Sequence, residues 1–146
     1  MPQLKSILVP VDFSRSSDRA LEMAIFLAES LGAKLELVHV WEPPRLEGTP
    51  AATVSGQPIE EYARKSSEPK LEQLLARVPV ALRDRVKSTF EVGQPWERLV
   101  ARAKLHDLVV MGTNGHTGRV HSMAGSVAES VVRLSPTPVL TVKDQD

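Results

Sequence analysis

The segment from Gly112 to Ser126 holds the residues whose types and spacing are best suited to chemistry. It begins GTNGHTGR and ends with Gly125-Ser126. Glycines at three-residue spacing let a backbone curl so that several N–H groups face one point, and such a curl binds anions. Arg119 adds a fixed positive charge. Gly125 and Ser126 open a helical segment whose first amides also attract anions. Together these features indicate a polyphosphate site.

A second candidate is Asp12, which directly follows the apolar run ILVPV. A carboxylate at this place can accept hydrogen bonds from ribose hydroxyls or from the amine of a base. It can equally cap the helical segment that follows, or interact with the dipole of that helix. The residue and its position leave both interpretations open.

Strands must position these two segments. Apolar and β-branched runs predict five strands, at residues 7–11, 35–40, 88–92, 108–111 and 139–142. Helical segments separate them, so the chain is predicted to form one α/β domain over residues 1–146, with a doubly wound, all-parallel, Rossmann-like sheet and helices on both faces.

The helical segments follow the spacing of apolar residues and the capping residues. The first helix is bounded by the capping serines Ser14, Ser16 and Ser17 and by Gly32. Residues 59–86 are mostly helical, Gly93 and Pro95 open a third helix, and the last covers 126–134. Tyr62 is expected on the buried stripe of the second helical segment. Residues 42–58, rich in proline and glycine, are expected to be a variable surface loop.

The order of the strands follows from their composition. ILVPV and LVVM are continuously apolar, as central strands are, whereas STFEV is short and polar and the fifth strand follows Pro136 and Pro138, as suits edges. The predicted order is therefore 3-2-1-4-5. Its winding reverses between the first and fourth strands, where open α/β sheets bind ligands. Asp12 and the glycine-rich segment are thus expected to form one site.

Composition excludes several other classes. Eighteen basic residues balance eighteen acidic ones, and the chain has no cysteine, which removes thiolate metal sites and disulfides and argues against nucleic acid or membranes as partners. No Walker motif occurs, and no G-x-G-x-x-G follows the first strand. The four histidines lack metal-ligand spacing. With no signal peptide or long apolar run, a cytoplasmic location is expected.

The pattern G-x-x-G, nine residues, then G-S, from Gly112 to Ser126, resembles the nucleotide-binding signature of the universal stress protein (UspA-like) family, ATP-binding type. ILVPVDFS, LELVHV, GSVAESVV and SPTPVLTVK extend the resemblance over the chain outside its middle. The family fold is adenine nucleotide alpha hydrolase-like. The resemblance implies an ATP site, with Mg²⁺ or Mn²⁺ held through the phosphates and not by side chains.

The same resemblance implies how the site is divided. Pro10, Val11 and Asp12 would lie beside adenine and ribose, and Val40 would line the adenine pocket. Ribose and phosphates would be held by Met111, Gly112, Gly115, Gly125, Ser126 and Val127. Family members also pair through the last strand, which implies a homodimer here through Val139, Leu140 and Val142.

His116 departs from the family, many of whose members have arginine there and a histidine where this chain has Asn114. A neutral imidazole offers a triphosphate less charge than a guanidinium does. Because the ordinary pKa of histidine is about 6.5, ATP affinity should rise as the pH falls below about 6.5. Calorimetry from about pH 8 to about pH 6 tests this prediction, and a flat affinity would contradict it.

Three functions remain open from the sequence. The first is an ATP-sensing stress-response protein, the second a nucleotide-free interaction module of the same fold, and the third a slow ATPase or an enzyme that phosphorylates itself at Thr113, Thr117 or Ser126. The intact signature favours the first over the second. Fast hydrolysis requires a positioned water and charge stabilisation, and the sequence shows neither. It therefore favours a binder over an efficient enzyme.

Overall fold

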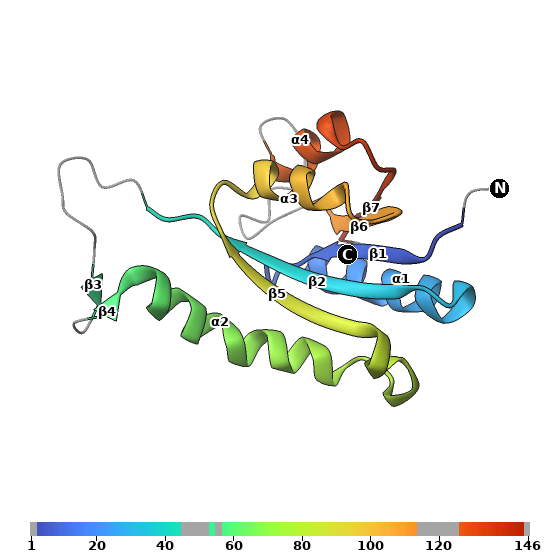
Figure 1. Ribbon diagram of the computed structural model, residues 1–146, viewed down its shortest axis with the longest axis horizontal. Coiled ribbons are helices and arrows are strands. Elements are labelled where there is room, and N and C mark those ends of the chain that lie inside the picture. Colours follow the sequence, from blue (N-terminus) through green and yellow to red (C-terminus); the bar gives the residue numbers. More distant parts are fainter. Residues whose placement is uncertain (1–2, 45–52, 55–56, 114–125, 145–146) are drawn as a thin grey trace.

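The computed structural model contains the predicted five-stranded parallel sheet. It describes residues 3–44, 53–54, 57–113 and 126–144. The strands lie in the order β5-β2-β1-β6-β7 (Figure 1), which confirms the predicted order 3-2-1-4-5. Their bounds are β1 (Ser6–Pro10), β2 (Lys34–Trp41), β5 (Val86–Val92), β6 (Leu108–Gly112) and β7 (Val139–Val142).

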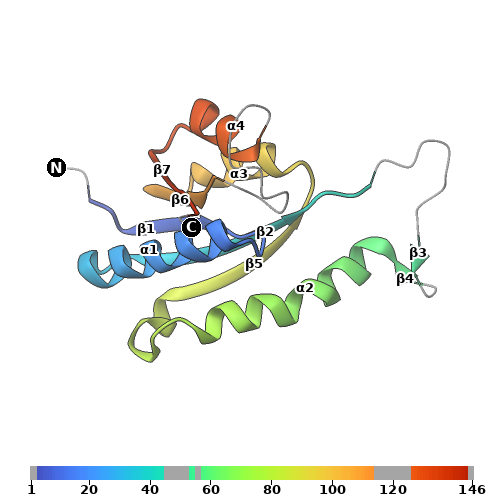
Figure 2. The same cartoon turned by 180° about the vertical axis from the view of Figure 1, so that it is seen from behind.

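Helices cover both faces of the sheet, as predicted. Helices α1 (Arg15–Leu31) and α2 (Ile59–Ala76) lie on one face, whereas α3 (Pro95–Ala103) and α4 (Val127–Leu134) lie on the other (Figures 1 and 2). The side chains of β1 point alternately into two core clusters, one on each face of the sheet. Ile7 and Val9 belong to the cluster with α1 and α2, whereas Leu8 belongs to the cluster with α3 and α4. Each is fully buried. A central strand with two covered faces needs this continuous apolar run.

The ends of α1 match the capping residues in the sequence. Ser14 is the N-cap, and its Oγ accepts a hydrogen bond from Ser17 N at 3.3 Å. Gly32 adopts the left-handed conformation, with φ 71°, and its N–H donates to Ala28 O at 2.8 Å. These caps satisfy backbone groups that helix ends leave without partners. They also fix where α1 starts, next to Asp12.

The middle of the chain differs from the prediction in two places. A short antiparallel pair, β3 (Thr53–Val54) with β4 (Gln57–Pro58), lies within the expected surface loop, while residues 45–52 and 55–56 lie outside the described residues. The helical segment predicted over 59–86 ends at Ala76 and is followed by a 3-10 helix, η1 (Val80–Arg85). β5 starts at Val86 because that residue already pairs with Leu35 of β2.

The prediction that Tyr62 lies on the buried stripe of its helix was wrong, because Tyr62 is 48% exposed. Leu71 and Leu74 of the same helix are buried. Within the part of the chain that the structure describes, no helix combines the length and apolarity that a membrane crossing requires.

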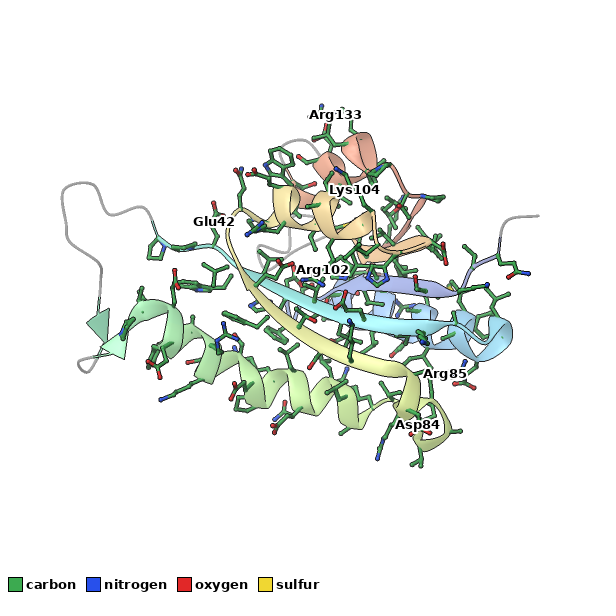
Figure 3. All side chains as sticks on the ribbon, in the orientation of Figure 1. Glu42, Asp84, Arg85, Arg102, Lys104 and Arg133 are labelled. Carbon is green, nitrogen blue, oxygen red and sulfur yellow. The ribbon has the colours of Figure 1, made fainter. Side chains whose placement is uncertain are left out.

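A buried carboxylate links β2 to β5 and to α3. Glu36 of β2 is only 2% exposed. Its carboxylate accepts hydrogen bonds from Thr89 Oγ1 at 2.8 Å, from Arg102 Nη1 at 3.0 and 3.1 Å, and from His106 Nε2 at 2.9 Å. Lys87 Nζ lies 3.5 Å away. Figure 3 shows Arg102 between α3 and the strands.

The surroundings of Glu36 keep it charged. Burial by itself would raise the pKa of this carboxyl, but hydrogen bonds from Thr89 and His106 and the charge of Arg102 outweigh burial and lower the pKa to about 2. Arg102 also donates through Nε to Glu91 at 2.7 Å. Burying a charge is costly unless it is paired and hydrogen-bonded, and the Glu36 carboxylate is both. The cluster therefore serves the packing of α3 on the sheet.

Candidate functional site

A cavity of about 570 Å³ opens where the carboxyl ends of β1 and β6 lie side by side. This is the predicted place, because the connections from these two strands leave toward opposite faces of the sheet. Its walls come from β1, β2, β6 and the first turns of α1, α3 and α4. They are formed by Pro10, Val11, Asp12, Ser17, Val38, Val40, Glu42, Pro95, Leu99, Met111, Gly112, Thr113, Ser126, Val127 and Ala128.

Eight of the predicted site residues line this one cavity. They are Pro10, Val11, Asp12, Val40, Met111, Gly112, Ser126 and Val127. The other four predicted residues, Gly115, His116, Arg119 and Gly125, lie outside the described residues. The structure thus joins segments about a hundred positions apart in the sequence.

Asp12 lines the cavity and also organises the start of α1. Its Oδ1 accepts hydrogen bonds from Ser14 N at 3.0 Å and from Ser14 Oγ, and its N–H donates to Ser17 Oγ at 3.3 Å. Asp12 thereby supports the N-cap instead of being the N-cap. Within the described residues these bonds use Oδ1, so Oδ2 is available to a ligand hydroxyl. The two interpretations of Asp12 are therefore compatible.

Gly112 ends β6 where the strand meets the first turn of α1. A Cβ atom at this position would lie 2.4 Å from Ser16 Oγ, 2.6 Å from the carbonyl carbon of Ser16 and 2.8 Å from Ser17 N. Real Cβ atoms do not come this close to backbone, so only glycine fits. The family resemblance implies that Gly112 contacts ribose or phosphate. The structure shows a second reason for glycine here, which is the close packing of β6 on α1. The sequence held no signal for that packing.

The start of α4 forms the other end of the cavity. Ser126 is the N-cap, and its Oγ accepts a hydrogen bond from Glu129 N at 3.1 Å. Val127 and Ala128 follow it in the cavity wall. The first N–H groups of a helix carry partial positive charge. This end of the cavity therefore suits an anion.

Sequence reasoning missed several lining residues, and two of them left a signal. Val38 precedes Val40 by two positions, so the period of a strand places both on one face. Leu99 follows Pro95 by one helical turn, and both line the cavity from α3. Glu42 is exposed just beyond β2 (Figure 3), where no periodicity applies.

The cavity has an apolar part and a polar part. Val38, Val40, Leu99 and Met111 provide apolar walls. The charged side chains among the described lining residues are the carboxylates of Asp12 and Glu42. In the described ranges, no group of three or more metal-ligating side chains occurs. Apolar walls beside a few polar groups are typical of small-molecule sites.

Comparison with known proteins bears on the family and the fold of the chain. The model of the universal stress protein family matches residues 3–143. A universal stress protein of Methanocaldococcus jannaschii is 31% identical over 141 residues, which cover 95% of this chain and 82% of the relative. One from Mycobacterium tuberculosis is 30% identical over 149 residues, which cover 98% of this chain and 46% of the relative. The chain therefore spans about half the length of this second relative.

A solved structure extends the agreement to three dimensions. It is that of another Methanocaldococcus jannaschii universal stress protein, 27% identical, and it superposes with a TM-score of 0.77 over 99% of both chains. The family match covers nearly the whole chain, and the observed fold and strand order agree with it. This chain therefore belongs to the universal stress protein family.

Proposed function

We propose that this protein binds ATP in the cavity at the ends of β1 and β6 and acts as a nucleotide-dependent stress-response protein of the cytoplasm. The observation that carries the proposal is the meeting of Asp12, Val40 and the start of α4 around one cavity. The apolar walls suit adenine, the carboxylate of Asp12 suits ribose hydroxyls, and the first amides of α4 suit phosphates. The adenine, the ribose and the phosphates of a nucleotide need these three environments.

A divalent cation completes this proposal. Mg²⁺ in nucleotide sites is bound chiefly through phosphates and keeps several waters, so it needs few ligands from protein. The cavity offers the hydroxyls of Ser17, Thr113 and Ser126 and the carboxylate of Asp12 in its walls. These oxygen atoms fit hydrogen bonds with the waters of an Mg²⁺ or Mn²⁺ ion that the phosphates hold. Such an ion would neutralise phosphate charge beside the lining carboxylates.

Introducing a negative charge at the start of α4 tests the site. Val127→Glu should weaken ATP binding by at least about tenfold, because the new carboxylate would repel the phosphates from the helix end. Val127 is 38% exposed, so the substitution leaves the core intact. The measurements are the nucleotide content of the purified protein, by chromatography after denaturation, and calorimetry with added Mg-ATP, AMP and cyclic AMP.

The matched control places the same substitution at the other end of the molecule. Val80→Glu, in η1, changes a valine that is 74% exposed and lies outside the cavity, and it should bind like the wild type. A wild-type protein that carries no nucleotide and ignores added Mg-ATP would overturn the proposal. In that case the chain would be an interaction module of the same fold.

A homodimer through β7 is the second part of the proposal. β7 pairs with β6 at the edge of the described sheet, and Leu140 is 37% exposed there. A strand edge with apolar side chains favours pairing with another chain. Light scattering at micromolar concentration should give twice the chain mass of 16.0 kDa, and Leu140→Asp should return the single-chain mass. A wild type at the single-chain mass would refute the dimer.

A further inference from the structure

We propose that Phe13 and His39 are positioning residues for the cavity, which hold the turn carrying Asp12 from the opposite face of the sheet. The proposal rests on the proposed nucleotide function, and it assigns these residues a part in binding although neither lines the cavity. It starts from a feature of the backbone directly after Asp12.

Phe13 has φ 66°, and among the residues that the structure describes it is the one non-glycine residue with positive φ. This left-handed conformation is unfavourable for a residue with a Cβ atom, and in structures such outliers gather at functional sites. Phe13 follows Asp12 and precedes Ser14, the N-cap of α1. The strained residue therefore lies in the turn between the cavity and the helix.

The left-handed turn allows the hydrogen bonds that orient Asp12. The chain reverses at residue 13, so Asp12 Oδ1 can accept from Ser14 N at 3.0 Å while Asp12 N donates to Ser17 Oγ at 3.3 Å. Relaxation of Phe13 to an ordinary conformation would separate these groups. The orientation of the Asp12 carboxylate therefore depends on a conformation that its neighbour does not prefer.

His39 of β2 holds this turn in two ways. Its ring packs on the ring of Phe13 with 4.6 Å between centroids, and its Nδ1 lies 2.8 Å from Val11 O. A carbonyl only accepts, so Nδ1 carries the hydrogen. Val11 N in turn donates to Val38 O at 2.8 Å. Both polar backbone groups of the residue before Asp12 are thus fixed.

Helix α2 and β5 support these rings from outside. The ring of Phe90 in β5 lies 6.1 Å from that of His39. Lys70 Nζ lies 5.3 Å from the centre of the Phe13 ring, and Arg64 lies over Phe90 at 5.0 Å, both within the range of cation–π attraction. Phe13 also packs against the core cluster that α1 and α2 share. The ring contacts therefore stabilise the strained backbone.

Ligand affinity should therefore depend on residues that lie on the face of the sheet covered by α1 and α2, outside the cavity. If the ring of Phe13 or the donor of His39 is removed, the turn leaves its left-handed conformation in part of the molecules. The apparent dissociation constant then rises by the inverse of the fraction that still holds Asp12 in place. A tenth of the molecules in the competent form corresponds to about a tenfold weaker binding.

The test uses two pairs of variants in the full chain. His39→Leu removes the donor to Val11 O, whereas His39→Asn keeps an amide that can donate to the same carbonyl. Phe13→Ala removes the ring, whereas Phe13→Tyr keeps it. Leu82→Val is the stability control, because Leu82 is buried in the same core cluster but lies in η1, outside the cavity.

Two measurements are made on each variant. Amide hydrogen exchange without nucleotide reports on the N–H groups of Asp12 and Ser14, and calorimetry gives the affinity for Mg-ATP. His39→Leu and Phe13→Ala should exchange faster at both amides and bind about tenfold more weakly. Phe13→Tyr and Leu82→Val should keep exchange and affinity near the wild type. His39→Asn keeps a donor but loses the ring contact, so its exchange and affinity should lie between those of His39→Leu and the wild type.

The outcomes separate this inference from the proposed function. Unchanged affinity in His39→Leu and Phe13→Ala, with a wild type that binds ATP, overturns the positioning role and leaves the proposed function standing. An equal loss of affinity in Leu82→Val also overturns it, because general stability would then explain the effect. A wild type that binds no nucleotide overturns both proposals together.

Discussion

Gly112→Ala should destabilise the fold by about 3 kcal/mol and abolish ATP binding. Overpacking a fitted site costs about 1–3 kcal/mol, and this substitution lies at the upper end because the new Cβ atom would meet backbone. It would lie 2.6 Å from the Ser16 carbonyl carbon and 2.8 Å from Ser17 N. Neither atom can rotate away, so β6 and α1 must separate. Urea unfolding and calorimetry with Mg-ATP measure the two effects.

Gly32→Ala is the matched control for this prediction. Gly32 has φ 71°, and the nearest atom to an added Cβ would be Arg85 Nη1 at 3.9 Å. The space is open, so only the left-handed conformation costs free energy, about 1–2 kcal/mol. Gly32 also lies far from the cavity lining, so ATP affinity should not change. Equal losses of stability in the two variants would show that close packing at Gly112 is not the cause.

Glu36→Ala should cost about 3–5 kcal/mol of folding stability, because truncating one member of a buried ion cluster leaves its partners uncompensated. Arg102 keeps Glu91 as a partner, but the hydroxyl of Thr89 and the Nε2–H of His106 lose their acceptor. Urea unfolding at neutral pH measures the loss. A cost near that of a surface pair would contradict the assigned role.

A surface pair provides the comparison for Glu36. Glu61 and Lys65 of α2 lie 3.4 Å apart with side chains 50% and 56% exposed. Exposed pairs at this spacing are worth about 0.3–0.5 kcal/mol. Glu61→Gln should therefore change stability by no more than about 0.5 kcal/mol. The contrast between the two glutamates isolates the effect of burial.

The low pKa of Glu36 also gives the direction of a pH effect. The folded-state pKa is about 2, against the ordinary value of 4.5, so between these values the unfolded chain binds a proton that the folded chain does not. The stability from this group is complete above about pH 4.5 and is lost as the pH falls toward 2. The stability gap between the wild type and Glu36→Gln should therefore narrow over that range. A constant gap would contradict the assignment.

The order of the strands was predictable because it depends on a local property. Central strands need apolar residues on both faces, and β1 and β6 show this in their own sequences. The position of the cavity followed from that order alone. Asp12 and Ser126 were predictable in the same way, since each stands where a strand ends or a helix begins. Val40 was reached only through the family resemblance.

The remaining features depend on partners far away in the chain. Glu36 alternates with leucines in LELVHV and looks like a residue facing solvent, yet it pairs with residues 53–70 positions away. The need for glycine at 112 arises from Ser16, on a helix nearly a hundred residues earlier. The conformation of Phe13 depends on a ring in β2. No spacing rule connects such positions.

The two edge strands of the sheet differ in how readily they can pair with a strand of another chain. β5 carries Lys87, whose side chain is 72% exposed, and a charged edge resists the addition of another strand. β7 offers Val139, Leu140 and Val142 instead. Pairing of one β7 with another is symmetric and uses the same edge of both chains. Head-to-tail pairing of β7 of one chain with β5 of the next would instead add chains indefinitely. In the proposed dimer, the charged edge at β5 would therefore disfavour the further head-to-tail addition of chains, and with it growth into fibres.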